Sequence, residues 1–500
     1  MSLRVDWRVS AGILGRVLRW LTLALAVPVV AALWYDEALG PFLAAAAVSL
    51  AVGLSLERIG RWDAENVGPR EAYLAVSLVW LAIALVGAVP FVLGGAGAIA
   101  RPEYALFESM SGITTTGATV VVDFGAQPRS LLLWRSLLQW LGGLGILALA
   151  TAVLATLGVG GAQLMETESQ LEDVNKLTPR LIDTARIIWG LYVLLTVGTV
   201  GLLLALRVSG LAPEMTPYDA VAHAFTSIST SGFSPRPDSA GAFSPAVQWA
   251  FVLVMTVGAT NFVLLYHLLG GDRSRIRRSD EFRFYVAVLA GASALVFALL
   301  LVTPGNGPLG EETLRHSAFQ VVSIVTTTGY ATLDYTVWPA SAKHVLFMLM
   351  FVGGMAGSTT CSVKALRWLV ILRAFRRDLY TTVHPEAVRP VRLSGRPVDE
   401  EAVQDIYAYT LLVIVGFFLG AVLLVVDAAR VGLALSEFEA LGAAASTFLN
   451  IGPAFGLAGP FDSYAPFPRS SKLLMTVLMW VGRLEIVPVL VLLTPAYWRS

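Results

Sequence analysis

The sequence predicts an all-α polytopic membrane protein, in which a two-span leader precedes four tandem span–pore helix–filter loop–span repeats around a central pore. Three observations lead to this prediction. Apolar residues make up 56% of the 500 residues and charged residues only 14%, whereas a soluble domain carries roughly 25% charged residues. Uncharged stretches of about 20 residues, long enough to cross a bilayer, recur along the chain. A shorter segment ending in glycine recurs four times.

Ten uncharged stretches predict ten membrane spans. The leader spans lie between Arg19 and Asp36 and between Glu37 and Glu57, and the others lie near 72–99, 136–157, 187–206, 244–269, 284–303, 345–363, 406–426 and 473–498. An even number of spans puts both termini on one side. Arginines at the span ends, such as those in 273–278, gather on that side, which the positive-inside rule makes cytoplasmic. The basic N-terminus resembles a signal peptide, but no convincing cleavage site follows it, so we interpret the first span as retained.

Four connections on the opposite side each carry an apolar run of about a dozen residues, too short to span a bilayer. These runs predict short re-entrant helices, and they align on a final glycine. A hydroxyl residue stands six positions before each glycine (Ser111, Thr226, Ser323, Ser446). A large apolar residue stands four before it (Ile113, Ile228, Val325, Phe448). We therefore divide the chain into a leader, 1–64, and repeats at 65–175, 176–279, 280–395 and 396–500.

The repeated loops predict a cation site. Short helices pointing their carboxyl ends at one axis present partial negative charge there. Glycine permits positive φ, so carbonyl oxygens can replace an ion's hydration shell. No carboxylate stands among the last four residues before any of the glycines, which favours potassium over calcium or magnesium. The predicted potassium-binding filter residues are Thr114, Thr115, Thr116, Gly117, Ser229, Thr230, Ser231, Gly232, Thr326, Thr327, Thr328, Gly329, Asn450, Ile451 and Gly452.

Glycine beside small hydroxyl residues is also typical of close helix packing in membranes. Four aligned copies favour the filter interpretation over packing for these loops. The glycine-rich runs at 141–145 and 95–100 lie in or beside apolar spans with no strand before them, so we assign them to packing and not to nucleotide binding.

These segments resemble the Trk/Ktr/HKT superfamily of potassium transporters over nearly the whole chain. Three further stretches, 139–145, 353–364 and 482–485, are similar to family signatures, and the two-span leader favours the TrkH branch over KtrB. The resemblance implies a protein of the bacterial inner membrane that forms a homodimer with one pore in each protomer. It also implies a cytoplasmic nucleotide-binding regulatory subunit of the TrkA type.

The resemblance also implies an intramembrane gate. Its residues here are Gly353, Gly354, Gly357, Ser358, Thr359, Lys364 and Arg483. The family usually has more glycine where this chain has residues 360–362. The small residues from Gly353 to Ser362 predict that this stretch breaks the span near 345–363 and obstructs the conduction path. Arg483 and Glu485 are the only charges between Lys472 and Arg499. They could neutralise each other at a helix interface, or Arg483 could repel cations below the filter; the resemblance favours the second. We expect Glu108 to be a hydrogen-bonded support behind the first loop.

The predicted function is potassium uptake across the plasma membrane, driven by the membrane potential and gated from the cytoplasmic side. A sodium- or proton-coupled symporter with the same filter remains an alternative. A membrane-embedded transferase would need clustered carboxylates or a base pair facing the membrane surface, and the repeats contain neither, so no enzyme activity is expected. A net charge of zero offers no general attraction for nucleic acid. One cysteine and five scattered histidines exclude disulfide and zinc scaffolds, so potassium is the only cofactor expected.

Overall fold

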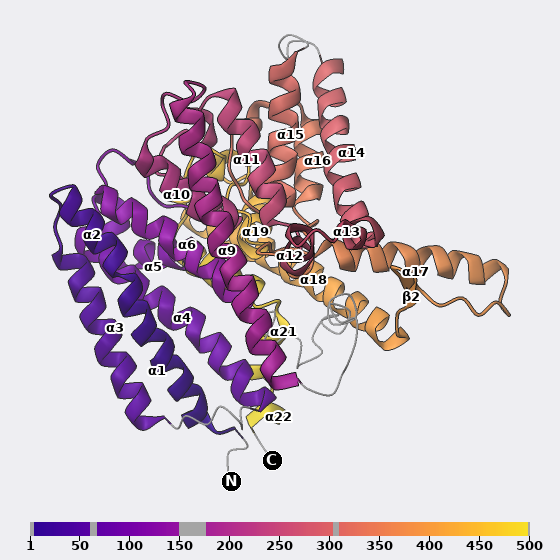
Figure 1. The fold of residues 1–500 in the computed structure, drawn as a ribbon, viewed down its shortest axis with the longest axis horizontal. Coiled ribbons are helices and arrows are strands. Elements are labelled where there is room, and N and C mark those ends of the chain that lie inside the picture. The colour runs from indigo at the N-terminus through magenta and orange to yellow at the C-terminus, as the bar shows by residue number, and fades with distance from the viewer. Residues whose placement is uncertain (1–4, 61–67, 150–176, 304–309, 499–500) are drawn as a thin grey trace.

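The computed structural model describes residues 5–60, 68–149, 177–303 and 310–498, and helices dominate it (Figure 1). The all-α prediction is confirmed. The long helices are α1 (Trp7–Ala24), α3 (Gly40–Ile59), α4 (Pro69–Gly94), α6 (Arg129–Leu149), α9 (Leu177–Val208), α14 (Asp280–Val302), α17 (Ala365–Val383) and α18 (Glu400–Val431). The expected boundaries at 64/65 and 175/176 lie outside the described residues.

Shorter helices complete the described chain. They are α2 (Ala26–Trp34), α5 (Pro102–Ile113), α10 (Pro217–Ile228), α11 (Pro245–Gly258), α12 (Phe262–Leu269), α13 (Arg273–Arg278), α15 (Glu311–Val325), α16 (Ala340–Leu349), α19 (Glu437–Phe448), α20 (Arg469–Arg483), α21 (Val487–Leu492) and α22 (Pro495–Trp498). Four 3-10 turns lie at Gly97–Ala100, Ser239–Ala242, Tyr335–Val337 and Gly456–Ala458. The only strands in the described part are β1 (Arg392–Leu393) and β2 (Arg396–Pro397), which form an antiparallel hairpin.

Several helices are suited to a bilayer. In the described ranges, seven are long and apolar enough to cross a membrane, and the pair α11 and α12, bent by 106°, is an eighth candidate. Apolar side chains along α18 are exposed, among them Leu411, Val415 and Phe418. The chain is therefore a multi-pass membrane protein.

Three of the ten predicted spans are not continuous helices. For the spans near 244–269 and 473–498 this corrects the sequence-based expectation, whereas the break in the span near 345–363 agrees with the prediction from its small residues. The span near 244–269 breaks between α11 and α12, that near 345–363 leaves helical structure after Leu349, and that near 473–498 breaks after α20. Glu485 and Ile486 have φ of 58° and 64° at the last break, which an α-helix cannot accommodate. Hydropathy alone does not detect such breaks, because the residues around them are still largely apolar.

The leader packs through small residues. Helices α1 and α3 lie side by side, and a Cβ atom on Gly15 would lie 2.7 Å from the carbonyl oxygen of Gly53. Small residues of this kind let membrane helices approach closely. Helix α1 begins well before the predicted span, and Arg19 within it forms an ion pair of 2.9 Å with Glu57 on α3. Both leader helices also contact α4.

One arrangement of helices occurs four times. Each short helix, α5, α10, α15 or α19, packs against the long helix that precedes it, α4, α9, α14 or α18. A helix of 12 residues is about 18 Å long, well short of the roughly 30 Å hydrocarbon core. The short helices end at Ile113, Ile228, Val325 and Phe448, the aligned apolar positions of the sequence.

The four units contact one another in a closed order. Helix α6 packs on α10, α11 on α15, and α20 on α5, which joins the last unit to the first. The third junction is aromatic, since the rings of Phe347 on α16 and Phe438 on α19 lie 5.6 Å apart. The contacts therefore bring the carboxyl ends of the short helices to the middle of the molecule.

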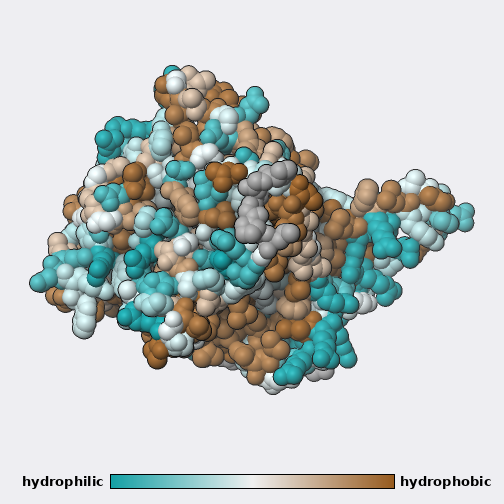
Figure 2. All heavy atoms as spheres, turned by 90° about the horizontal axis from the view of Figure 1, so that it is seen from above, coloured by the Kyte–Doolittle hydropathy of each residue, from teal (hydrophilic) through white to brown (hydrophobic). Residues whose placement is uncertain are grey.

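Helix α17 projects from the side of this assembly (Figure 1). Seen from the end opposite α22, the projection carries hydrophobic residues along one edge and hydrophilic residues along the other (Figure 2). Leu372, Phe375 and Val383 are exposed on it. The expected boundary at 395/396 falls between β1 and β2, at the hairpin beyond this helix.

Candidate functional site

Each short helix is followed by a loop with the same backbone conformation. The residue two positions before the final glycine has φ between 49° and 56° in all four loops. These residues are Thr115, Thr230, Thr327 and Asn450. The final glycines, Gly117, Gly232, Gly329 and Gly452, have φ between 73° and 108°. Positive φ costs a residue with a Cβ roughly 1–2 kcal/mol, so its recurrence indicates a conformation imposed by the surroundings.

The loops contact one another in a ring that follows chain order. In each contact, the final glycine of one loop faces the carbonyl oxygen of the residue just before the final glycine of the next loop. A Cβ atom on the glycine would lie only 1.9–2.7 Å from that oxygen. The pairs are Gly117 with Ser231, Gly232 with Thr328, Gly329 with Ile451, and Gly452 with Thr116. These positions therefore exclude every side chain.

The repeated hydroxyl residues lie where each loop turns back on its helix. The residue before the final glycine donates its N–H to the carbonyl oxygen of the hydroxyl residue, at 2.8–2.9 Å in all four loops. The donors are Thr116, Ser231, Thr328 and Ile451. The hydroxyl of Ser323 also donates to Tyr330 O, and that of Ser446 to Gly452 O, both at 2.6 Å. The spacing in the sequence thus reflects a local turn.

The structure brings all the predicted filter residues together in these four loops, but the loops are not identical. Hydroxyl pairs brace the first three, at 2.8 Å for Thr114 and Thr116, and equivalent pairs join Ser229 to Ser231 and Thr326 to Thr328. In the fourth loop Asn450 reaches across instead, and its Nδ2 donates to Thr116 Oγ1 at 2.8 Å and to Met479 O at 2.9 Å.

A buried ion pair supports the first loop. Glu108 and Arg135 are 0% and 1% exposed, and their Oε1 and Nε atoms lie 2.7 Å apart. The carboxylate also accepts from Val120 N at 2.8 Å, which agrees with the expectation that it is a hydrogen-bonded support. The guanidinium stacks on Phe233 at 4.0 Å and donates to Ser234 O at 3.3 Å. The pair therefore links the chain that follows the first loop to the chain that follows the second.

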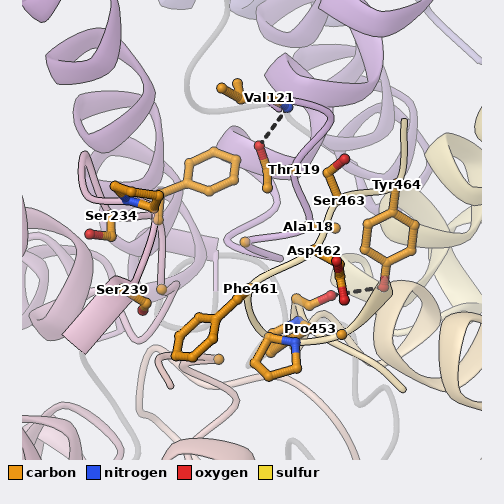
Figure 3. A pocket seen from close by; sticks show the side chains of 18 of the residues that line it. Ala118, Thr119, Val121, Ser234, Ser239, Pro453, Phe461, Asp462, Ser463 and Tyr464 are labelled. Atoms are coloured by element: carbon orange, nitrogen blue, oxygen red, sulfur yellow. Dashed lines mark hydrogen bonds between the residues drawn. The ribbon is translucent and has the colours of Figure 1, made fainter. Parts of the chain in front are cut away.

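A cavity of about 580 Å³ opens on one side of the ring and is lined by all four final glycines. Residues that follow the first, second and fourth loops surround it, with Phe461 and Pro453 among them (Figure 3). Tyr464 donates to Gly452 O at 2.8 Å (Figure 3). Arg236 also lines the cavity and pairs with Asp219; burial would raise the pKa of Asp219, but its bonds with Arg236 and Thr216 lower it below the usual value.

On the other side of the loops lies an irregular stretch between α16 and α17, residues 350–364, called here the intramembrane segment. Thr359 Oγ1 lies 2.9 Å from Thr230 Oγ1 and donates to Gly258 O at 3.0 Å. The N–H of Cys361 donates to Thr327 Oγ1 at 3.0 Å. The segment therefore bonds directly to the positive-φ threonines of the second and third loops.

The other predicted gate residues stabilise the conformation of this segment through hydrogen bonds and close backbone contacts. Gly353 donates to Val363 O at 2.8 Å, and a Cβ on Gly354 would lie 2.8 Å from Ala259 O. Gly357 has φ of 72°, and its carbonyl accepts from Phe262 N at 3.1 Å, where α12 begins. Further bonds join Ser358 Oγ to Thr360 Oγ1 at 2.8 Å and Lys364 Nζ to the same Thr360 Oγ1 at 3.1 Å. The broken helix pair α11–α12 and the intramembrane segment are thus joined by a hydrogen bond and by close backbone contact.

Arg483, at the end of α20, is 1% exposed and binds the segment. Its Nη1 donates to Thr359 O at 3.1 Å and to Cys361 Sγ at 2.6 Å, and its Nη2 donates to Gly142 O at 3.1 Å. Its expected alternative partner, Glu485, forms its ion pair with Arg367. The interpretation of Arg483 and Glu485 as a self-neutralising pair is therefore wrong, because the turn after α20 carries Glu485 toward α17.

Sequence reasoning missed Arg135, Gln139 and Arg367 as partners of the site. All three are buried, with exposures of 1%, 0% and 6%. Arg135 and Gln139 are polar positions within an otherwise apolar stretch, which is the signal that could have singled them out. Arg367 stands near basic residues that the positive-inside rule already explained.

Four short helices that each follow a long apolar helix, glycine loops in mutual contact and a cavity lined by their final glycines are typical of a polytopic protein of the membrane-transport class. The family model described as TrkH, cation transport protein, matches residues 43–500, so the chain belongs to the TrkH family. It is 34% identical over 507 residues to the Trk system potassium uptake protein TrkH of Halomonas elongata, covering 100% of both chains. It is also 34% identical over 483 residues to that of Escherichia coli K12, covering 95% of each. The crystal structure of the potassium transporter TrkH from Vibrio parahaemolyticus matches with a TM-score of 0.87 and 30% identity, over 99% of this chain and 100% of that one.

Proposed function

We propose that this protein takes up potassium through a filter formed by its four glycine loops. The observation that carries the proposal is the ring of contacts between each final glycine and the carbonyl of the next loop. Converging carbonyls without carboxylates favour a monovalent cation that dehydrates readily. The related proteins named above are potassium uptake proteins, which supports the choice of ion.

Each of the four pore repeats contributes one of these loops. The filter residues are then the hydroxyl, asparagine and glycine positions from Thr114 to Gly117 and their equivalents in the other three loops. Positive φ at two positions of each loop supports this role, because alternating backbone conformations can direct successive carbonyls toward one axis. A potassium ion would exchange its water for these oxygens as it enters from the cavity.

The intramembrane segment is the proposed gate. Its bonds to Thr230 and Thr327 support a closed state in which the segment occupies the path immediately beyond the filter. Arg483 would hold this state in two ways, by donating to the segment and by placing a buried positive charge beside the path of a cation. Opening requires the bond between Thr359 and Thr230 and the bond between Cys361 and Thr327 to break.

A membrane potential provides the driving force in this proposal. A potential of 100 mV is equivalent to about 2.3 kcal/mol for a monovalent cation, which supports roughly fifty-fold accumulation without a second ion. Coupling to sodium or protons is the competing mechanism. It predicts that the reversal potential depends on the gradient of the second ion.

The proposed setting is the bacterial inner membrane, with both termini in the cytoplasm. The cluster of Val5, Leu74 and Tyr497 supports a common side, since it joins the first and last parts of the described chain. The basic residues of α13 would then face the cytoplasm. Family resemblance further suggests a homodimer bound to a cytoplasmic TrkA-type nucleotide-binding subunit.

Reconstitution of the pure protein in liposomes tests the proposal. The reversal potential should follow the potassium gradient and respond little to sodium. It should also stay constant when a proton gradient is imposed at fixed potassium, whereas a symporter would shift it. A current that does not discriminate potassium from sodium would contradict the filter.

A further inference from the structure

Gln139 is a buried side chain outside the loops that bonds to a junction between two of them. Gln139 lies on α6, is 0% exposed, and reaches the second loop with both ends of its amide. Its Nε2 lies 2.6 Å from Ser231 O, and its Oε1 lies 2.9 Å both from Ser231 Oγ and from Phe233 N. The amide therefore forms hydrogen bonds with the residues on both sides of Gly232.

The orientation of this amide follows from its partners. A backbone N–H can only donate, so the atom of Gln139 that faces Phe233 must be the oxygen. The NH₂ group then faces Ser231 O, which can only accept. That carbonyl also meets the first loop, because a Cβ on Gly117 would lie 2.3 Å from it. Gln139 thus donates to the oxygen at the junction between the first and second loops.

The other three repeats have methionine at the equivalent position. Gln139 stands three residues before Gly142, and the sequence Met-x-Val-Gly occurs at the equivalent place of the other repeats, with Met255 in α11, Met350 directly after α16 and Met479 in α20. All three methionines are 0% exposed. Gly142 and Gly258 confirm the register for the first two repeats, since a Cβ on either would contact the carbonyl that ends its own short helix. A thioether has no proton to donate, so this bond distinguishes the first repeat.

We propose that Gln139 is a positioning residue that sets ion selectivity by holding the Ser231 carbonyl. A carbonyl that accepts an N–H bond is held in place and offers a cation a weaker field than a free one. Replacing the amide by an apolar side chain would let this oxygen move toward a smaller ion, which favours sodium. The inference rests on the proposed filter. It implies that the Ser231 carbonyl offers the ion a weaker field than the equivalent carbonyls of the other three loops.

Two variants test it. Gln139→Met installs the residue of the other repeats and removes all three bonds, with little change of volume. Gln139→Glu keeps an acceptor for Ser231 Oγ and Phe233 N but places an oxygen where the donor was. Met255→Leu is the matched control, since it changes a buried side chain at the same position of the second repeat without changing any side-chain hydrogen bond. The full-length protein is used throughout.

Two readouts separate selectivity from folding. The first is the potassium-over-sodium permeability ratio from reversal potentials in liposomes, which should fall about five-fold in both Gln139 variants and stay unchanged in the control. The second is the difference in melting temperature between potassium and sodium chloride at equal ionic strength. Preferential binding of potassium to the native state gives the wild type a higher melting temperature in potassium, and the difference should shrink in the variants.

A merely structural role for Gln139 would lower the melting temperature equally in both salts and leave the ratio unchanged, which would overturn the inference. If Gln139→Met does not fold, Gln139→Glu decides by the same two readouts. If neither folds, Gln139 is needed for folding and the inference is also overturned. A wild type that shows no potassium preference in either readout would instead refute the proposed filter itself.

Discussion

Replacing Gly232 by alanine should lower the selectivity for potassium over sodium by more than the accompanying loss of stability can account for. Its Cβ would lie 1.9 Å from the carbonyl oxygen of Thr328, whereas ordinary contacts begin at 3.4 Å, so the second and third loops must separate by about 1.5 Å. Gly232 also has φ of 73°, which costs alanine roughly 1–2 kcal/mol. If the ring is the proposed filter, opening it on one side prevents it from holding a potassium ion with all its oxygens.

Gly210 offers a control for the backbone strain alone. It has φ of 77°, but a Cβ there would meet nothing within 4 Å. Gly210→Ala should therefore lower the melting temperature slightly, by the strain of roughly 1–2 kcal/mol, and leave selectivity unchanged. Gly232→Ala should lower the potassium-over-sodium permeability ratio about tenfold or more in liposomes. A folded Gly232→Ala protein with the wild-type ratio would refute the idea that these loops form the filter.

Three further predictions concern the gate and the support of the first loop. Arg483→Ala should raise potassium flux several-fold, with Arg483→Lys intermediate, and should cost less stability than a broken buried ion pair because Glu485 keeps its own partner; flux at or below the wild-type level would contradict the gating role. Thr359→Val, which has the same shape without the hydroxyl, should also raise flux by weakening the closed state, and unchanged flux would show that its bonds do not hold the gate. Arg135→Met should destabilise the protein by about 3–5 kcal/mol because it leaves Glu108 buried and unpaired, and adding Glu108→Gln should restore part of the melting temperature; no restoration would show that the two residues do not act as a pair.

Local patterns predicted a large part of the candidate site. The hydroxyl and apolar residues six and four positions before each glycine correspond to the turn of each loop and to the last residue of each short helix. Such features depend on residues within a few positions of one another, so aligned repeats reveal them. The resemblance pointed to the proposed gate segment, and the break predicted from its small residues agrees with the structure, in which α16 ends at Leu349.

Partners distant in the chain could not be predicted in this way. A pair between Glu485 and Arg483, two residues away, was one of two alternatives, but the positive φ at Glu485 and Ile486 turns Glu485 toward Arg367, 118 residues earlier. Two spans expected to be continuous, near 244–269 and 473–498, are broken, because a break depends on carbonyls and side chains that other helices supply. One example is Asn261, whose amide donates to Ala356 O at 2.7 Å.

The sequence by itself determined the all-helical membrane class and the recurrence of four segments that end in glycine, because hydropathy and short-range spacing depend on residues close together in the chain. Only the tertiary structure decided that the loops meet in chain order, that Gln139 bonds to one carbonyl of the ring, and that Arg483 binds the intramembrane segment. Each of these contacts joins residues about 90 or more positions apart. Their pairing depends on how the helices pack, and a single sequence carries no local signal for it.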